Sequence, residues 1–165
     1  MNPANKKESV DSKNIDLLLE QYKLYVETME KLVERRQTAH SVLLTANAFL
    51  MTMAGFFVKD VKPPVSLPSG IAVVAVAVAG ILLSFTWQKL SQHYGLMNRA
   101  KFEVIHALER QLPTAPFLDE WHALGEGKDP RRYQSMATIE STIPKIFIGC
   151  YTVLALFALF VMTYK

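Results

Sequence analysis

Residues 14–58 read NIDLLLEQYKLYVETMEKLVERRQTAHSVLLTANAFLMTMAGFFV, and this stretch decides the fold. In its first half, apolar side chains recur at alternating spacings of three and four residues, which is the heptad pattern of a packed helix. These side chains belong to Ile15, Leu18, Tyr22, Tyr25, Met29 and Leu32. A second row widens the apolar stripe and consists of Leu19, Val26 and Val33. No Gly or Pro interrupts this half, so the pattern predicts one helix that continues into the second half.

The second half, residues 39–58, carries no charged side chain. Twenty residues of helix, at about 1.5 Å each, extend over roughly 30 Å, which is the thickness of a bilayer's hydrocarbon core. Arg35 and Arg36 precede this stretch, where long cationic side chains can reach lipid headgroups. A buried helix of a soluble protein would be the alternative, but two further apolar stretches of similar length favour a membrane protein.

Composition narrows the possible functions. The net charge of +3 is mild, which suits contact with an anionic lipid surface and gives no reason to expect nucleic acid as a partner. The single cysteine, Cys150, lies in an apolar segment and is expected to be a small buried hydrophobe. The first 38 residues are polar or amphipathic, so the first spanning helix is expected to serve as its own uncleaved insertion signal.

The chain is expected to be an all-α integral membrane protein with three transmembrane helices and a long helical hairpin that extends into the cytoplasm. Its expected segments are a mobile tail at 1–13, a helix at 14–58 whose part 39–58 spans the membrane, an external loop at 59–66, a helix at 67–112 whose part 67–87 spans the membrane, a cytoplasmic loop with a short helix at 113–142, and a third span at 143–165.

Within the second helix, the spacing predicts a packed seam formed by Trp87, Leu90, Tyr94, Met97, Val104 and Leu108. A hairpin that turns at the Pro63–Pro64 pair sets residue i near residue 127 − i, which predicts a contact between His40 and Trp87. Small residues in the second span predict close helix approach, and they are Ala72, Ala75, Ala79 and Gly80.

The distribution of cations predicts the topology. Residues 1–38 and residues 88–142 carry seven Lys and Arg each, whereas the loop at 59–66 carries two. Because cations are retained on the cytoplasmic side, the N-terminus and residues 88–142 are expected inside and the C-terminus outside.

Polar side chains in the first span are candidates for a pore lining or a polar helix interface, and they are Ser41, Thr45, Asn47 and Thr52. Hydroxyl groups in helices often bond to their own backbone, and this reading is favoured for the three hydroxyl residues. For Asn47, near the middle of the membrane, a hydrogen bond to another helix is favoured.

Two further sets of residues are candidates for surface roles. Anchors at the membrane surface are expected at Arg35, Arg36, His40, Trp87 and Lys145. For His40, a contact with a headgroup or with Trp87 is favoured over proton sensing. A surface for a soluble partner would consist of Phe117, Trp121, Arg131 and Arg132.

The pattern of titratable residues does not suggest catalysis. The spacing of the four histidines does not match a metal site, and no phosphate-binding loop, nucleophile elbow, HExxH or CxxC motif is present. We therefore expect no enzyme activity, no metal and no cofactor.

Two segments, YKLYVETMEKLVERRQTAHSVLLTANAFL at 22–50 and WQKLSQHYGLMNRAKFEVIHALERQLPTAPFLDEW at 87–121, resemble the RipA-like family of small bacterial octameric membrane proteins. The most specific matches are RRQTA at 35–39, NRAKFEVI at 98–105, and ERQLP at 109–113 followed by Glu120-Trp121. The resemblance implies a homo-oligomer in the inner membrane, with eight copies as the expected number, and no activity. A more distant similarity links the chain to two-span effectors of bacterial defence systems, from which its third span departs.

Two functions follow as hypotheses. The first is a homo-oligomeric scaffold or channel-like assembly with a cytoplasmic helical vestibule, because an amphipathic stripe this wide needs more neighbours than one hairpin supplies. The second is a membrane-anchored adaptor that recruits an unidentified soluble partner through residues 88–142. Its expected partners are otherwise further copies of itself and membrane lipids.

Overall fold

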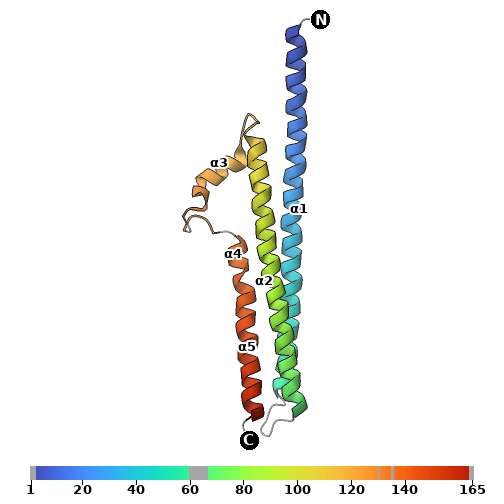
Figure 1. The fold of residues 1–165 in the computed structure, drawn as a ribbon, viewed down its shortest axis with the longest axis vertical. Helices are drawn as coiled ribbons and strands as arrows, with labels where there is room; N and C mark the ends of the chain where they lie inside the picture. Colours follow the sequence, from blue (N-terminus) through green and yellow to red (C-terminus); the bar gives the residue numbers. More distant parts are fainter. Residues whose placement is uncertain (1–2, 60–66, 130, 135, 164–165) are drawn as a thin grey trace. The chain divides into compact units, whose positions relative to one another are not determined.

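The structure, a computed structural model, is all-helical over the residues that it describes, which are 3–59, 67–129, 131–134 and 136–163. Its elements are α1 (Pro3–Lys59), α2 (Leu67–Glu109), α3 (Pro116–Ala123), the one-turn η1 (Gly125–Gly127), α4 (Met136–Glu140) and α5 (Thr142–Thr163) (Figure 1). Three helical stretches are long and apolar enough to cross a membrane, and they are Lys13–Val58, Pro68–Glu109 and Thr138–Thr163.

Element bounds differ from the expected ones at several ends. Helix α1 begins at Pro3 rather than at Asn14, because residues 4–13 contain no helix breaker and proline is tolerated in a first turn. Mobility of this end stays a prediction. Helix α2 begins at Leu67 as expected and ends at Glu109, before Pro113. The expected external loop lies outside the described residues except for Lys59.

Contacts divide the chain into two units. Unit 1 comprises Met1–Arg35 and Tyr94–Ser135, and unit 2 comprises Arg36–His93 and Met136–Lys165. The three stretches expected to span the membrane belong to unit 2, whereas the charged part of α1, the second half of α2 and all of α3 belong to unit 1.

In unit 2, α2 packs through a seam of mostly small side chains. Its buried positions alternate by three and four residues, and they are Gly70, Val73, Ala77, Gly80, Ser84, Trp87 and Ser91. Small residues let helix backbones approach closely in a membrane, where lipid supplies no hydrophobic drive between helices. Of the predicted small positions, Gly80 lies in this seam, whereas Ala75 and Ala79 lie on the exposed face. The third helix of the unit, α5, buries Pro144, Tyr151 and Ala158.

In unit 1, the seam of α1 agrees with the expected heptad pattern, since Met29 and Leu32 are its most buried members. The expected seam of α2 is only partly right in this unit, where its members Tyr94 and Leu108 are half-buried. Met97 and Val104 are 39% and 40% exposed, whereas Ile105 and Glu109 are buried. The inward positions of α2 include polar side chains with partners on α1, so an apolar spacing alone selects the neighbouring row.

Candidate functional site

Asn47 stands at the centre of a polar contact among three helices of unit 2. Its side chain is fully buried, and its Oδ1 accepts a hydrogen bond of 2.9 Å from the Ser84 hydroxyl on α2. Its Nδ2 donates to the Leu43 carbonyl of its own helix at 2.9 Å. The Tyr151 hydroxyl on α5 donates to the Asn47 backbone carbonyl, also at 2.9 Å. The predicted bond from Asn47 to another helix is therefore confirmed, and it ties α1 to α2 within one chain.

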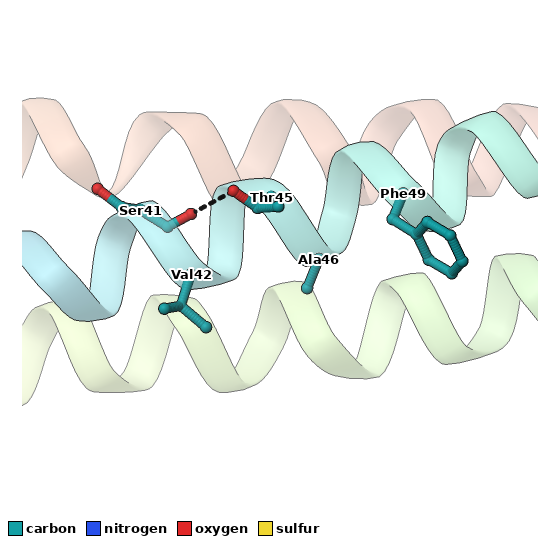
Figure 2. A pocket seen from close by; sticks show the side chains of 5 residues that line it. All are labelled: Ser41, Val42, Thr45, Ala46 and Phe49. Carbon is teal, nitrogen blue, oxygen red and sulfur yellow. Dashed lines mark hydrogen bonds between the residues drawn. The ribbon is translucent and has the colours of Figure 1, made fainter.

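The hydroxyl residues of the first span bond to their own helix. Thr45 donates to the Ser41 carbonyl and Thr52 donates to the Ala48 carbonyl, each at 2.9 Å. This agrees with the favoured interpretation of these threonines. Ser41 and Thr45 line a shallow, open groove on α1 together with Val42, Ala46 and Phe49, and Figure 2 shows these side chains along the helix. The groove is therefore mainly apolar, although two hydroxyl residues belong to it.

A second polar cluster surrounds His40, near the predicted membrane entry. The Trp87 indole nitrogen donates to His40 Nδ1 at 2.7 Å, which confirms the predicted contact between these two residues. Because an indole N–H can only donate, Nδ1 must accept, and the imidazole carries its proton on Nε2. That nitrogen lies 3.2 Å from Glu140 Oε2 and 3.5 Å from the Ser91 hydroxyl. Arg36 Nε lies 3.6 Å from the same carboxylate oxygen, so α4 meets α1 through charged and polar groups.

The five expected anchors divide into two kinds. Arg35 and Lys145 are exposed, as an anchor at a lipid surface requires. Arg36, His40 and Trp87 turn toward other residues of their unit, and Trp87 is only 1% exposed. These three side chains hold helices of unit 2 together, a role that the sequence pattern did not separate from lipid contact.

Sequence reasoning missed Glu109, the buried carboxylate of unit 1. It is 1% exposed and accepts three hydrogen bonds, one from the Tyr22 hydroxyl at 2.9 Å and two from the backbone N–H groups of Phe117 and Leu118 at 3.0 and 2.8 Å. Those two N–H groups belong to the first turn of α3, whose own N-cap residue, Ala115, supplies no side-chain bond. Glu109 therefore caps α3 from the end of α2, and the negative charge suits a helix N-terminus.

A second polar side chain, Lys101, lies in the same interface, between the predicted seam residues Met97 and Val104. Lys101 donates to the Thr28 hydroxyl at 2.9 Å, and its ammonium lies 4.7 Å from the centre of the Tyr25 ring. A cation over an aromatic ring is favourable, so this lysine occupies an inward position while its charge keeps partners.

The environment of Tyr22 predicts an unusual titration. Burial, followed by the hydrogen bond and the negative charge of Glu109, raises the pKa of Tyr22 to about 12 from its ordinary value of 10.0. The contribution of neutral Tyr22 to stability is therefore fully present below pH 10 and is lost as the pH rises toward 12. Subtracting the tyrosinate absorbance of Tyr22→Phe from that of the wild type should leave one transition near pH 12. A difference curve centred at pH 10 would contradict the contact with Glu109.

The expected partner surface is partly used within unit 1. Phe117 lies near the rings of Tyr22 and Phe102, at centroid distances of 6.5 and 6.1 Å. Trp121 packs edge-on against Tyr133 at 5.4 Å, beside a turn at Gly125–Gly127 in which all three residues have positive φ. Both aromatic side chains are half-buried, whereas Arg131 and Arg132 are exposed. The four residues thus do not form one exposed surface.

Among the residues that the structure describes, no group of three His, Cys, Asp or Glu side chains could hold a metal ion. Hydrogen bonds in the polar clusters around Asn47, His40 and Glu109 each join one helix to another.

Comparison with protein families identifies the group to which this chain belongs. Residues 19–160 match the octameric membrane protein family, so the chain is a member of that family and a membrane protein. The match covers most of the chain and confirms the coarser part of the resemblance seen in the sequence, while the RipA-like subgroup stays a prediction. Neither the curated proteins nor the solved structures include a match.

Proposed function

We propose that this member of the octameric membrane protein family assembles from eight copies of itself in the inner membrane of a bacterium and serves there as a scaffold. In this assembly the apolar parts of α1, α2 and α5 cross the bilayer. The charged part of α1 and the second half of α2 extend into the cytoplasm as a ring of helical hairpins, the vestibule of the assembly. Family membership supports the copy number, and the excess of Lys and Arg at 1–38 and 88–142 supports the orientation.

The burial of Asn47 is the observation that favours a scaffold over an ion channel. A water-filled pore needs polar groups along its axis, and Asn47 is the amide side chain near the middle of the predicted first span. Its oxygen and nitrogen are both engaged within the protomer. The Thr45 and Thr52 hydroxyls donate to their own helix, and the groove beside them is lined by Val42, Ala46 and Phe49. Faces of this kind suit packing against another helix or a lipid chain.

Two measurements on the purified full-length protein test this proposal. Native mass spectrometry from a mild detergent should give the mass of eight chains. Planar bilayers that contain the same preparation should show no unitary currents. A monomeric mass would overturn the assembly, whereas reproducible currents that change in Thr45→Leu would overturn the scaffold and favour a channel.

The alternative function is a membrane-anchored adaptor that recruits a soluble partner through residues 88–142. One observation favours it, which is the pair of exposed arginines at Arg131 and Arg132. It ranks second because Phe117 and Trp121, the other members of that surface, pack against residues of their own unit. Replacing both arginines by glutamate in the full-length protein should leave the octamer intact, and loss of a soluble partner from the purified assembly would favour the adaptor.

A further inference from the structure

In unit 1, the α1 and α2 parts each carry an apolar row that the protomer leaves exposed. On α1 this row, here called the α1 outer row, contains Leu19 and Val33, which are 37% and 38% exposed, and the half-buried Val26. On α2 the corresponding α2 outer row contains Met97 and Val104, with exposed Ala100 and Ala107 between and after them. The α2 outer row alternates by three and four residues, and Leu19, Val26 and Val33 are seven apart, so both follow the repeat of helices that pack along their length.

The two rows lie on opposite sides of the helix pair. At about 100° per residue, the α1 outer row lies roughly 80° around its helix from the seam that faces α2. The α2 outer row lies roughly 130° around its helix from the seam that faces α1. On α1 this rotation follows increasing residue number, whereas on α2 it follows decreasing residue number. The contacts of Tyr22 with Glu109 and of Lys101 with Thr28 show that the helices are antiparallel. Viewed from one end of the pair, increasing residue number on one antiparallel helix turns in the same direction as decreasing residue number on the other. Starting from seams that face each other, these rotations place the α1 and α2 outer rows on opposite sides of the pair.

We propose that the α1 outer row of one protomer packs against the α2 outer row of the next copy of this chain. This inference rests on the proposed homo-octamer and names the surfaces that build its water-exposed part. A contact between two different surfaces of the same chain is heterologous, and heterologous contacts close into rings when the rotation between copies permits it. Two apolar rows on opposite sides of each protomer are what such a ring of eight requires, because every copy then has one neighbour on each side.

Closure of the ring also fixes which residues face one another. The contacts Tyr22–Glu109 and Thr28–Lys101 set the level of α1 against α2, and they bring Val26 level with Val104. Continuing the same register brings Val33 level with Met97. Rotation about a ring axis that runs along the helices moves no residue along that axis, so the same levels apply between neighbouring protomers. Val26 of one protomer is therefore expected to meet Val104 of the next.

Disulfide formation between separate chains tests this contact. In a Cys150→Ala background, Val26→Cys and Val104→Cys are introduced into two differently tagged copies that are expressed together. Mild oxidation of the membranes should yield a dimer that contains both tags. Neither variant expressed alone should cross-link, because a heterologous contact does not bring two copies of one position together. A single chain with both cysteines should give a ladder of oligomers of up to eight chains.

Leu24→Cys paired with Val104→Cys is the matched control, because Leu24 is apolar and 62% exposed but lies on the far side of α1 from Val26. It should give no mixed dimer. Mixed dimers of equal yield with Leu24→Cys, or cross-linking of either variant by itself, would overturn the proposed contact. An octameric mass without mixed dimers would overturn this inference alone, whereas a monomeric mass of the wild type would overturn the proposed assembly.

Discussion

Replacing Gly80 by alanine should lower the free energy of unfolding by about 1–3 kcal/mol, although the same change in a helix usually raises it by about 0.5–1 kcal/mol. A Cβ added at Gly80 would overlap with Cζ of the Tyr151 ring. Tyr151 is fully buried and its ring is rigid, so the whole ring has to move. Its hydroxyl then leaves the Asn47 carbonyl, and the bond that ties α5 to α1 is lost.

Two other glycines of unit 2 supply graded controls. A Cβ at Gly149 meets nothing within 4 Å, so Gly149→Ala should be neutral or stabilising. A Cβ at Gly70 would lie 2.5 Å from the sulfur of Met162, but that atom belongs to a flexible side chain that can turn away. Gly70→Ala should therefore fall between the other two variants. This order depends on what each glycine touches, because all three replacements add the same methyl group to a helix.

Unfolding in detergent, followed by circular dichroism, measures these differences. Combining Gly80→Ala with Tyr151→Leu should cost less than the sum of the two single changes, because the clash and the ring disappear together. If Gly80→Ala were as stable as Gly149→Ala, the close approach of α2 and α5 at this position would be refuted.

The sequence alone predicted the parts of this fold that depend on hydrophobic length and spacing. The uncharged stretches of α1, α2 and α5 have the lengths that a bilayer requires, and the heptad of α1 has Met29 and Leu32 as its most buried members. The contact between His40 and Trp87 was predicted by expecting a hairpin turn at the proline pair in the sequence, which sets the pairing of the two helices. The hydrogen bond between Asn47 and another helix was predictable because a lone amide inside a membrane needs a partner.

The parts that depend on polar side chains in inward positions were not predictable from periodicity. Lys101 and Glu109 belong to the true seam of α2 in unit 1, and an apolar pattern passes over them. The five-residue α4 was expected to be loop, because it is too short to carry a periodic pattern, and its Glu140 lies beside Arg36 and His40, far away in the sequence. The role of such a carboxylate can be assigned only when its partners are known.

Replacing Glu109 by glutamine should lower the free energy of unfolding by about 2 kcal/mol, although the side chain keeps its shape. Both carboxylate oxygens of Glu109 accept, one from Tyr22 and the Phe117 N–H and the other from the Leu118 N–H. A glutamine amide has one accepting oxygen and one donating nitrogen. In either orientation, a donor at the start of α3 then faces another donor. The change also removes a negative charge from the N-terminus of α3, and this loss destabilises the helix further.

Hydrogen exchange at the backbone amides of Phe117 and Leu118 measures this effect where it arises. In Glu109→Gln, both amides should exchange faster as the first turn of α3 opens, and the pKa of Tyr22 should fall from about 12 because Glu109 contributes to its rise. Glu103→Gln is the matched control, since it changes an exposed carboxylate on the same helix and should leave exchange at α3 unaltered. Tyr22→Phe removes one of the three donors and should open α3 less than Glu109→Gln does. Unchanged exchange at Phe117 and Leu118 in Glu109→Gln would mean that another group caps α3, and the polar centre of unit 1 would then have to lie elsewhere.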